Sequence, residues 1–131
     1  MDLADARIAE GLRTCLECLK AVFEQLTVAR VLFVVVIIPT KELVHEREIR
    51  NYWKDDIPSD LAKQLANEKE AISQAKEFLA HNGIPFVDVT AALRQAMDRG
   101  WQLYPETDDG HPNAAGYQVT VEFLAGIALP R

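Results

Sequence analysis

A histidine in a tight turn is the residue of this chain best suited to acid–base chemistry. The stretch 107–117 reads Thr-Asp-Asp-Gly-His-Pro-Asn-Ala-Ala-Gly-Tyr, so Asp108 and Asp109 closely precede His111. A carboxylate that binds one imidazole nitrogen leaves the other nitrogen available to take a proton from a nucleophile. We therefore expect His111 to act as a general base that is oriented by Asp108 or Asp109.

A purely structural interpretation of the same stretch stays open. Aspartate, glycine, proline and asparagine are the usual residues of turns and helix caps. Asn113 is a good cap for a helix that begins just after it, because its side chain can accept a backbone hydrogen bond. On this interpretation His111 is a surface residue in the turn that starts the helix.

The nucleophile that such a histidine would activate is harder to find. The chain has two serines, Ser59 and Ser73, and neither lies in a Gly-x-Ser-x-Gly or a Gly-Asp-Ser sequence. Cys15 and Cys18 fall inside a helical pattern, where we expect buried apolar residues rather than a redox pair. Thr40 is the one hydroxyl that we expect near the histidine.

The spread of the histidines argues against a metal centre. A zinc site needs about four ligands, and His45, His81 and His111 are far apart in the sequence. We therefore expect neither a metal nor a cofactor. His45 and His81 are expected to lie in exposed helices or loops.

Length, charge and hydropathy argue against several classes of protein. At 131 residues we expect a single domain over 1–131. The net charge of −6 and the lack of a basic stripe argue against binding to nucleic acid or to an anionic membrane. The first residues do not resemble a secretory signal, and the apolar run 31–39 is too short to span a bilayer. We expect a soluble protein and leave its compartment open.

Helices and strands alternate along the chain. Apolar residues at three- and four-residue steps predict helices over 4–27, 58–82 and 91–99, and a last helix after Asn113. Continuous apolar runs predict strands over 31–38 and 84–89. The segment 40–57 is expected to be a long connection with one helical turn. This order predicts an α/β fold with a short parallel sheet and flanking helices.

The predicted sheet places several polar residues at one edge. Ligands of open α/β sheets bind beside the carboxyl ends of the strands. Thr40 and Lys41 follow the first predicted strand, and the loop that carries His111 should emerge on the same side, so we expect Thr40 and Lys41 to bind substrate. Alternatively, Lys41 and Glu42 form an ordinary solvated turn. Asp88, near the end of the second strand, is expected to cap a strand end or a helix.

The last third of the chain resembles the C-terminal end of an SGNH (GDSL-type) hydrolase or acetyltransferase. Asp108 and His111 match the D-x-x-H motif of that family, and the residues from His111 to Tyr117 continue the match. Asp109 fits the D-x-H spacing of the related polysaccharide O-acetyltransferase-like branch. The segments 36–42 and 86–90 are similar to a strand end and to the last strand of the same branch.

This resemblance implies a three-layer α/β/α, flavodoxin-like fold that is truncated to its C-terminal half. It implies ester hydrolysis or acyl transfer on an acylated small molecule or carbohydrate. Asp108 and His111 carry over as the acid–base pair. The family's serine, on a Gly-Asp-Ser turn, and its oxyanion-binding glycine and asparagine match no residue of this chain. We therefore expect a hydrolase-like chain without its nucleophile and without activity on its own.

Two alternatives stay open. One is a complete small enzyme that uses Thr40 or Ser59 as its nucleophile, and the other is a binding module without a catalytic role. The run 31–38 is too apolar for an exposed sheet edge, so we expect something to cover it. A homodimer that pairs these strands or exchanges helices would do so.

Overall fold

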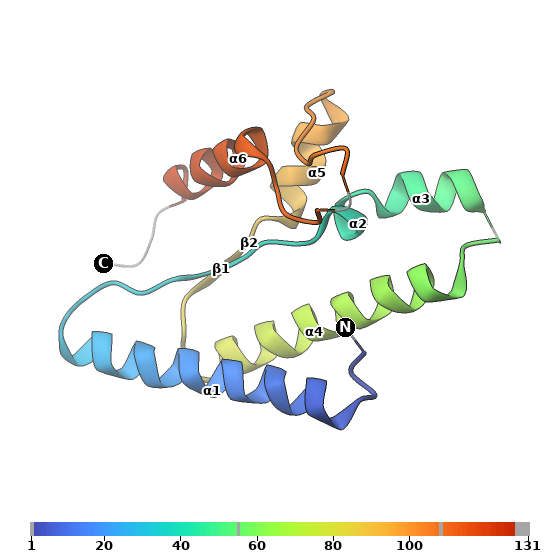
Figure 1. Cartoon of the computed structure of the whole chain (residues 1–131). Coiled ribbons are helices and arrows are strands. Elements are labelled where there is room, and N and C mark those ends of the chain that lie inside the picture. Colours follow the sequence, from blue (N-terminus) through green and yellow to red (C-terminus); the bar gives the residue numbers. More distant parts are fainter. Residues whose placement is uncertain (1, 55, 108, 128–131) are drawn as a thin grey trace. The chain divides into compact units, whose positions relative to one another are not determined.

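The computed structural model describes residues 2–54, 56–107 and 109–127. The chain forms two compact units, which are Met1–Val35 with Pro58–Phe86 and Val36–Ile57 with Val87–Arg131. Figure 1 shows the elements in chain order: α1 (Ala6–Val28), β1 (Val35–Ile37), α2 (Lys41–Val44), α3 (Glu46–Trp53), α4 (Ser59–His81), β2 (Phe86–Asp88), α5 (Thr90–Asp98) and α6 (Ala114–Ala125).

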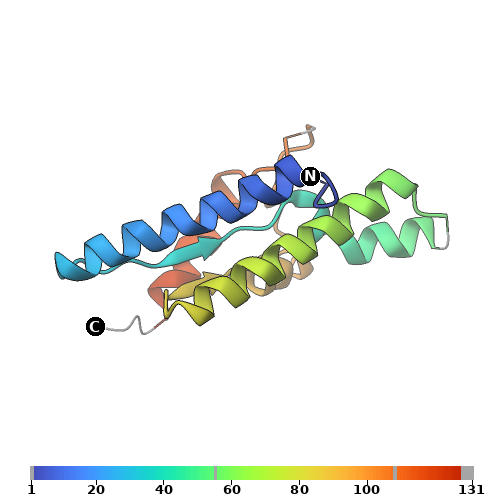
Figure 2. The same cartoon turned by 90° about the horizontal axis from the view of Figure 1, so that it is seen from below.

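The first unit is built on two long helices. α1 and α4 lie side by side in both views (Figures 1 and 2), and Leu16, Leu65 and Leu79 are buried. α4 ends at His81, and Gly83, two residues later, adopts a φ of +66° that a residue with a side chain rarely takes. The N–H of Ile84 then donates to the Leu79 carbonyl at 2.9 Å and closes the last turn, as the sequence Asn-Gly predicts.

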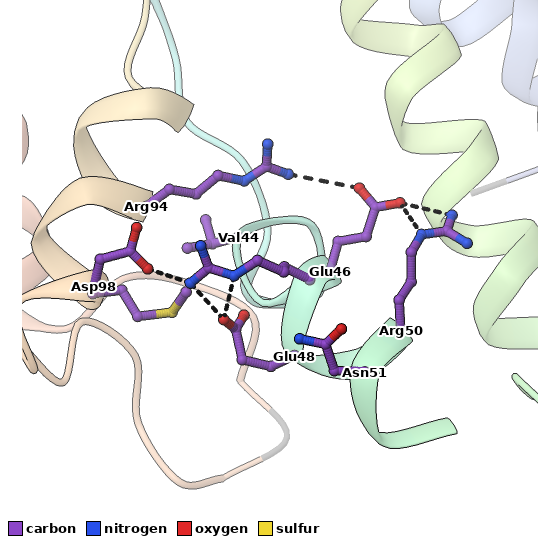
Figure 3. A pocket seen from close by; sticks show the side chains of 9 residues that line it. Val44, Glu46, Glu48, Arg50, Asn51, Arg94 and Asp98 are labelled. Carbon is purple, nitrogen blue, oxygen red and sulfur yellow. Dashed lines mark hydrogen bonds and ion pairs between the residues drawn. The ribbon is translucent and has the colours of Figure 1, made fainter. Parts of the chain in front are cut away.

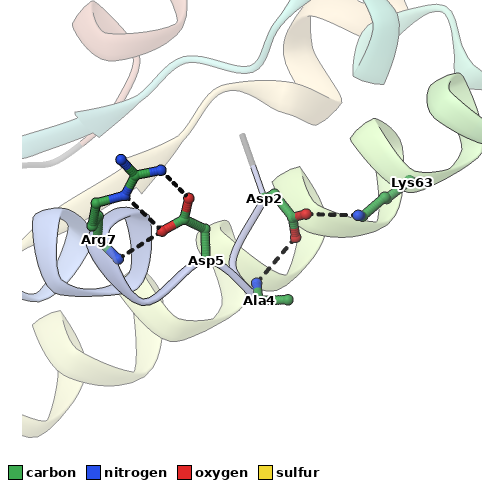
Figure 4. A network of polar contacts seen from close by, with 5 residues as sticks. All are labelled: Asp2, Ala4, Asp5, Arg7 and Lys63. Carbon is green, nitrogen blue, oxygen red and sulfur yellow. Dashed lines mark hydrogen bonds and ion pairs between the residues drawn. The ribbon is translucent and has the colours of Figure 1, made fainter.

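Polar contacts fix the start of α1 (Figure 4). Asp5 caps the helix, since its Oδ1 accepts a hydrogen bond from the N–H of Arg7 at 2.9 Å. Asp2 accepts hydrogen bonds from the N–H of Ala4 at 3.1 Å and from Lys63 Nζ on α4 at 2.6 Å. Surface ion pairs contribute little free energy, so these contacts mainly set where the helix begins.

The cysteines correct one expectation from the sequence. Cys15 and Cys18 are free and exposed, whereas the helical pattern predicted that they are buried. α1 buries Leu16, with Leu12 and Leu19 half-buried beside it. Cys15, three residues after Leu12 and four before Leu19, lies at the border of this face, and Cys18 lies beyond it, so neither side chain is covered.

Among the described residues, β1 and β2 form a two-stranded sheet, and the chain passes from one unit to the other within both strands. The N–H of Val35 donates to the Pro85 carbonyl at 2.9 Å, and the N–H of Val89 donates to the Ile37 carbonyl at 3.2 Å. The residue numbers on both strands increase from the first hydrogen bond to the second, as they do in a parallel pair of strands. The strands are shorter than the predicted 31–38 and 84–89, because a strand extends only as far as its backbone groups find partners.

The second unit has its own apolar core. Its buried members come from α2, α5 and the segments that flank them: Val44, Val89, Leu93, Ala96, Leu103 and Tyr104. Val36, Val87 and Val119 pack against this cluster, so that both strands and α6 contribute to it. The buried hydroxyl of Tyr104 donates to the Pro39 carbonyl at 3.1 Å. This bond ties the chain after β1 to the segment that precedes α6.

The segment 40–57 holds more helix than the sequence predicted. It forms α2 and the eight-residue α3, where one turn was expected. The Arg50 guanidinium lies 2.7 Å from the Glu46 carboxylate one turn earlier, a spacing that stabilises helices. Glu46 is also buried, so tertiary contacts add to a weak local preference.

The prediction of a mixed α/β chain with a short parallel sheet is therefore confirmed, with helix as the main component. None of the described helices has the length and the apolar character needed to cross a bilayer.

Candidate functional site

The Asp109 carboxylate binds the ring of His111. Asp109 Oδ1 lies 2.7 Å from His111 Nδ1 and also accepts a hydrogen bond from the His111 backbone N–H at 2.9 Å. Asp108, the other acid predicted to orient the ring, lies outside the described residues. Asp109 and His111 thus form an acid–base pair in the part of the chain that the structure describes.

The charge state of Asp109 sets the tautomer of the ring. The backbone N–H of His111, and secondly its ring, lower the pKa of the Asp109 carboxyl below its ordinary value. The ionised carboxylate can only accept hydrogen bonds, so Nδ1 of the neutral imidazole must carry the proton. This leaves the lone pair of Nε2 for proton transfer.

The pair lies at the surface. The His111 side chain is 84% exposed and that of Asp109 is 56% exposed. Solvent therefore screens the charge interaction, and the orientation of the ring depends on hydrogen-bond geometry more than on Coulomb attraction. The same exposure leaves the ring open to a large acceptor molecule.

Lys41 anchors the loop that carries the pair. We call residues 105–111 the dyad loop. Lys41 Nζ donates to the carbonyls of Pro105 at 2.8 Å and of Thr107 at 3.1 Å, and the Lys41 N–H donates to the Gly110 carbonyl at 3.2 Å. The dyad loop is therefore fastened to the residues that follow β1.

Thr40 and Glu42 also lie against the dyad loop. A Cβ atom built on Gly110 would lie 4.0 Å from the Thr40 Cβ and 3.8 Å from Glu42 Oε2. The sequence predicted that Thr40 and Lys41 gather beside the histidine loop, and the structure brings them there. Their role as substrate ligands stays a prediction, since the Lys41 ammonium already binds two loop carbonyls.

The residues after His111 hold the start of α6. The Asn113 side chain accepts hydrogen bonds from the N–H groups of Ala115 at 2.9 Å and Gly116 at 3.1 Å, and it donates to the Gln102 carbonyl at 2.8 Å. A Cβ atom on Gly116 would lie only 2.6 Å from the Leu103 carbonyl oxygen. The Pro-Asn-Ala-Ala-Gly sequence is therefore explained by the capping and close packing of this helix.

The other polar residue at the strand ends has a structural role. Asp88 Oδ1 accepts a hydrogen bond from the N–H of Thr90 at 2.8 Å, at the first turn of α5. This is the capping role that the sequence suggested for Asp88.

The second unit offers few nucleophiles to His111. Its residues include no serine and no cysteine, because Ser59, Ser73, Cys15 and Cys18 all belong to the first unit. Thr107 Oγ1 accepts a hydrogen bond from the Asp109 N–H at 3.4 Å, and Thr120 donates to the Gly116 carbonyl at 3.0 Å. Among the described residues, no group of three or more histidine, cysteine or acidic side chains could hold a metal ion.

Among the cavities of the second unit, two are lined by charged residues of α2 and α3, and neither was predicted from the sequence. One, of about 260 Å³, is lined by Lys41, Glu42, His45, Ile49 and Thr107. His45 is half-buried with its ring edge-on to Tyr104, rather than exposed as predicted. The other cavity, of about 490 Å³, lies at α3 and α5. Glu46 and Arg50, an acidic and a basic residue four positions apart, could have predicted the helix α3 that lines this cavity. The segment was instead interpreted from the sequence as a connection.

Comparisons with protein-family models, curated proteins and solved structures found no match to this chain. A functional assignment therefore depends on the residues of the chain itself and on their geometry.

Proposed function

We propose that the second unit carries the acid–base half of an ester-hydrolase or acyl-transfer site of the SGNH type. The contact of 2.7 Å between Asp109 Oδ1 and His111 Nδ1 is the observation that supports this proposal. It is the relation of a carboxylate to a catalytic histidine in hydrolases that activate a hydroxyl. The three-layer, flavodoxin-like arrangement is part of the same proposal.

In the proposed reaction, His111 Nε2 removes the proton of an attacking hydroxyl, and the oxygen adds to the carbonyl carbon of an ester. The imidazolium that forms is stabilised by the Asp109 carboxylate. The proton then passes from Nε2 to the oxygen of the departing alcohol, and the acyl group remains on the attacking oxygen. Atoms and charge balance without a cofactor.

The attacking hydroxyl comes from outside this chain in our proposal. The second unit has no serine or cysteine to supply it. An acceptor alcohol or another polypeptide would provide it, and an acylated small molecule or carbohydrate would provide the acyl group. The chain alone is then expected to show little hydrolysis.

The proposal is tested by acyl transfer to an added alcohol. We would mix p-nitrophenyl acetate, trifluoroethanol and the Cys15→Ala/Cys18→Ala double variant, because exposed thiols react with this ester. We expect trifluoroethyl acetate to form, and its rate of formation to fall by about tenfold or more in His111→Gln, since general-base catalysis by a positioned histidine contributes at least this much.

Two controls make the result specific. Asp109→Ala should lower the transfer as well, whereas His81→Gln, on α4 in the first unit, should leave it unchanged. If the double cysteine variant transferred the acetyl group equally well with and without His111→Gln, the role of the histidine would be refuted. Rapid ester hydrolysis in the absence of added alcohol, with a burst of nitrophenol, would show that the chain itself supplies a nucleophile.

Self-association is a second candidate function, because an apolar segment of the first unit is exposed. Val28 is 86% exposed, and Val31 and Leu32 are 53% and 55% exposed. Side chains of this size favour burial against a partner. We propose that a second copy of the chain covers them in a homodimer.

Sedimentation equilibrium tests the dimer. The wild-type chain should associate at micromolar concentration, and Leu32→Lys should be monomeric. Tyr52→Lys, which changes an exposed residue of the second unit, should associate like the wild type. A wild-type chain that remains monomeric throughout the micromolar range would contradict this candidate.

A further inference from the structure

A charged cavity separate from the dyad loop lies at α3 and α5 (Figure 3). Its volume of about 490 Å³ lies within the range of small-molecule sites. Six of the nine side chains drawn around it are charged, three acidic and three basic, and they are Glu46, Arg47, Glu48, Arg50, Arg94 and Asp98. The net charge of the lining is therefore zero, but the charges are not evenly spread.

One end of the cavity has an excess of positive charge. The Glu46 carboxylate lies between Arg50, at 2.7 Å, and Arg94, at 3.6 Å. Glu46 is buried, and one carboxylate faces two guanidinium groups. Arg94 also donates to the Leu43 carbonyl at 2.6 Å, which holds its side chain in place. This end is suited to an anionic group.

The other end has an excess of negative charge. Arg47 binds Glu48 Oε1 at 2.9 Å and also binds the Asp98 carboxylate, so one guanidinium faces two carboxylates. Glu48 Oε2 is buried and has no hydrogen-bond partner among the described residues. A buried carboxylate oxygen without a donor is unfavourable. A rotation of the Glu48 carboxyl group, whose side chain is 44% exposed, would bring this oxygen to the cavity, where a ligand with an N–H donor would satisfy it.

The remaining lining includes apolar atoms. Val44 is almost fully buried and Met97 is half-buried, and both contact the cavity. A ligand that matches all three features carries a cation, an anion and an apolar group. We propose that the cavity binds a small apolar zwitterion, a free amino acid or a dipeptide, with its ammonium at Glu48 and its carboxylate towards Arg50 and Arg94.

Methyl NMR of the full chain tests this proposal directly. The sequence contains two methionines, Met1 and Met97, so a sample labelled at the methionine methyl groups gives one probe in the cavity. The probes to be titrated are L-leucine and glycyl-L-leucine. N-acetyl-L-leucine lacks the ammonium and L-leucinamide lacks the carboxylate. We expect a saturable shift of the Met97 methyl with a zwitterion, and binding about tenfold weaker for each single-charge analogue.

Variants assign the two ends. Glu48→Gln should remove the preference for L-leucine over N-acetyl-L-leucine, and Arg50→Gln should remove the preference over L-leucinamide. Glu122→Gln, on α6 outside the cavity, should keep both preferences. If only glycyl-L-leucine saturates the Met97 shift, the ligand is a dipeptide. If only L-leucine does so, the ligand is a free amino acid.

The absence of a saturable Met97 shift with either zwitterion would overturn the proposal. Equal binding of the zwitterions and the single-charge analogues would overturn it too, and so would unchanged preferences in Glu48→Gln. The assay measures binding only, so its outcome is independent of the acyl-transfer proposal.

Discussion

The backbone N–H of Lys41 donates to the carbonyl of Gly110 at 3.2 Å, and the ammonium of the same lysine binds two further carbonyls of the dyad loop. Lys41 thus joins the chain that leaves β1 to the loop that presents His111. This relation places the Asp109–His111 pair on a loop that contacts the residues after β1, near which the sequence predicted a site.

Removal of the Lys41 ammonium should loosen the dyad loop. In Lys41→Met we expect faster amide hydrogen exchange within the loop, and a free energy of unfolding lower by about 1–2 kcal/mol, because charged hydrogen bonds to two carbonyls are lost. Exchange mass spectrometry measures the first effect and urea denaturation the second. Lys20→Met, on α1, removes the same charge elsewhere and should leave exchange in the loop unchanged. Unchanged loop exchange in Lys41→Met would argue against the anchor.

Alanine at two glycines should have opposite effects on stability. A Cβ on Gly116 would lie 2.6 Å from the Leu103 carbonyl oxygen and 2.7 Å from the Pro112 Cβ, so Gly116→Ala should lower stability by about 1–3 kcal/mol. A Cβ on Gly11, inside α1, meets nothing within 4 Å, and Gly11→Ala should raise stability by about 1 kcal/mol. Urea denaturation of both variants checks the signs, and a neutral Gly116→Ala would contradict the close packing at α6.

The pKa of Asp109 should respond only in part to the loss of the histidine ring. The His111 backbone N–H is the larger cause of the lowered pKa and the ring is the second. In His111→Ala the backbone N–H remains, so the pKa should rise but stay below its ordinary value. A carbon-13 NMR titration of the side-chain carboxyl measures it. A pKa that does not move in the variant would show that the ring makes no contact.

The lowered pKa of Asp109 also predicts the direction in which the stability of the fold changes with pH. A carboxyl whose pKa is lower in the folded than in the unfolded chain stabilises the fold above its unfolded value. The contribution of Asp109 is therefore complete at neutral pH and is lost as the pH falls through the folded value. The difference in stability between wild type and Asp109→Ala should therefore shrink as the pH falls through the pKa of Asp109 in the folded chain.

Both cysteines should react in the folded protein. Cys15 and Cys18 are exposed on α1, so Ellman's reagent should titrate two thiols per chain without denaturant. The reaction should proceed at rates typical of accessible thiols. Thiols that react only after addition of guanidinium would support the buried placement that the helical pattern suggested.

Local sequence patterns were sufficient to predict most elements of the fold. Periodic apolar residues predicted α1, α4 and α5, and Asn113 predicted the start of α6, because these signals act within one or two turns. The length of β1 was overestimated, since the run 31–38 shows an apolar preference but not the length of its partner strand. α3 was missed because the contacts of Glu46 with Arg94 come from a distant part of the chain.

The candidate site was predicted in part for the same reason. The Asp109–His111 contact spans two residues, so its spacing is visible in the sequence. The carbonyls that bind Lys41 and the cavity at α3 and α5 arise from segments separated by about half the chain, and no local pattern records them. Cys15 and Cys18 show the converse, because they extend the apolar pattern of α1 but lie outside the narrow face that is buried around Leu16.

The tautomer of His111 decides whether Asp109 orients the imidazole ring. Long-range proton–nitrogen NMR of the imidazole ring distinguishes a proton on Nδ1 from a proton on Nε2. We expect the neutral ring to carry its proton on Nδ1 in the wild type and to shift towards the Nε2-protonated form in Asp109→Ala. A wild-type ring protonated mainly on Nε2, with no difference in the variant, would contradict an Asp109-oriented general base.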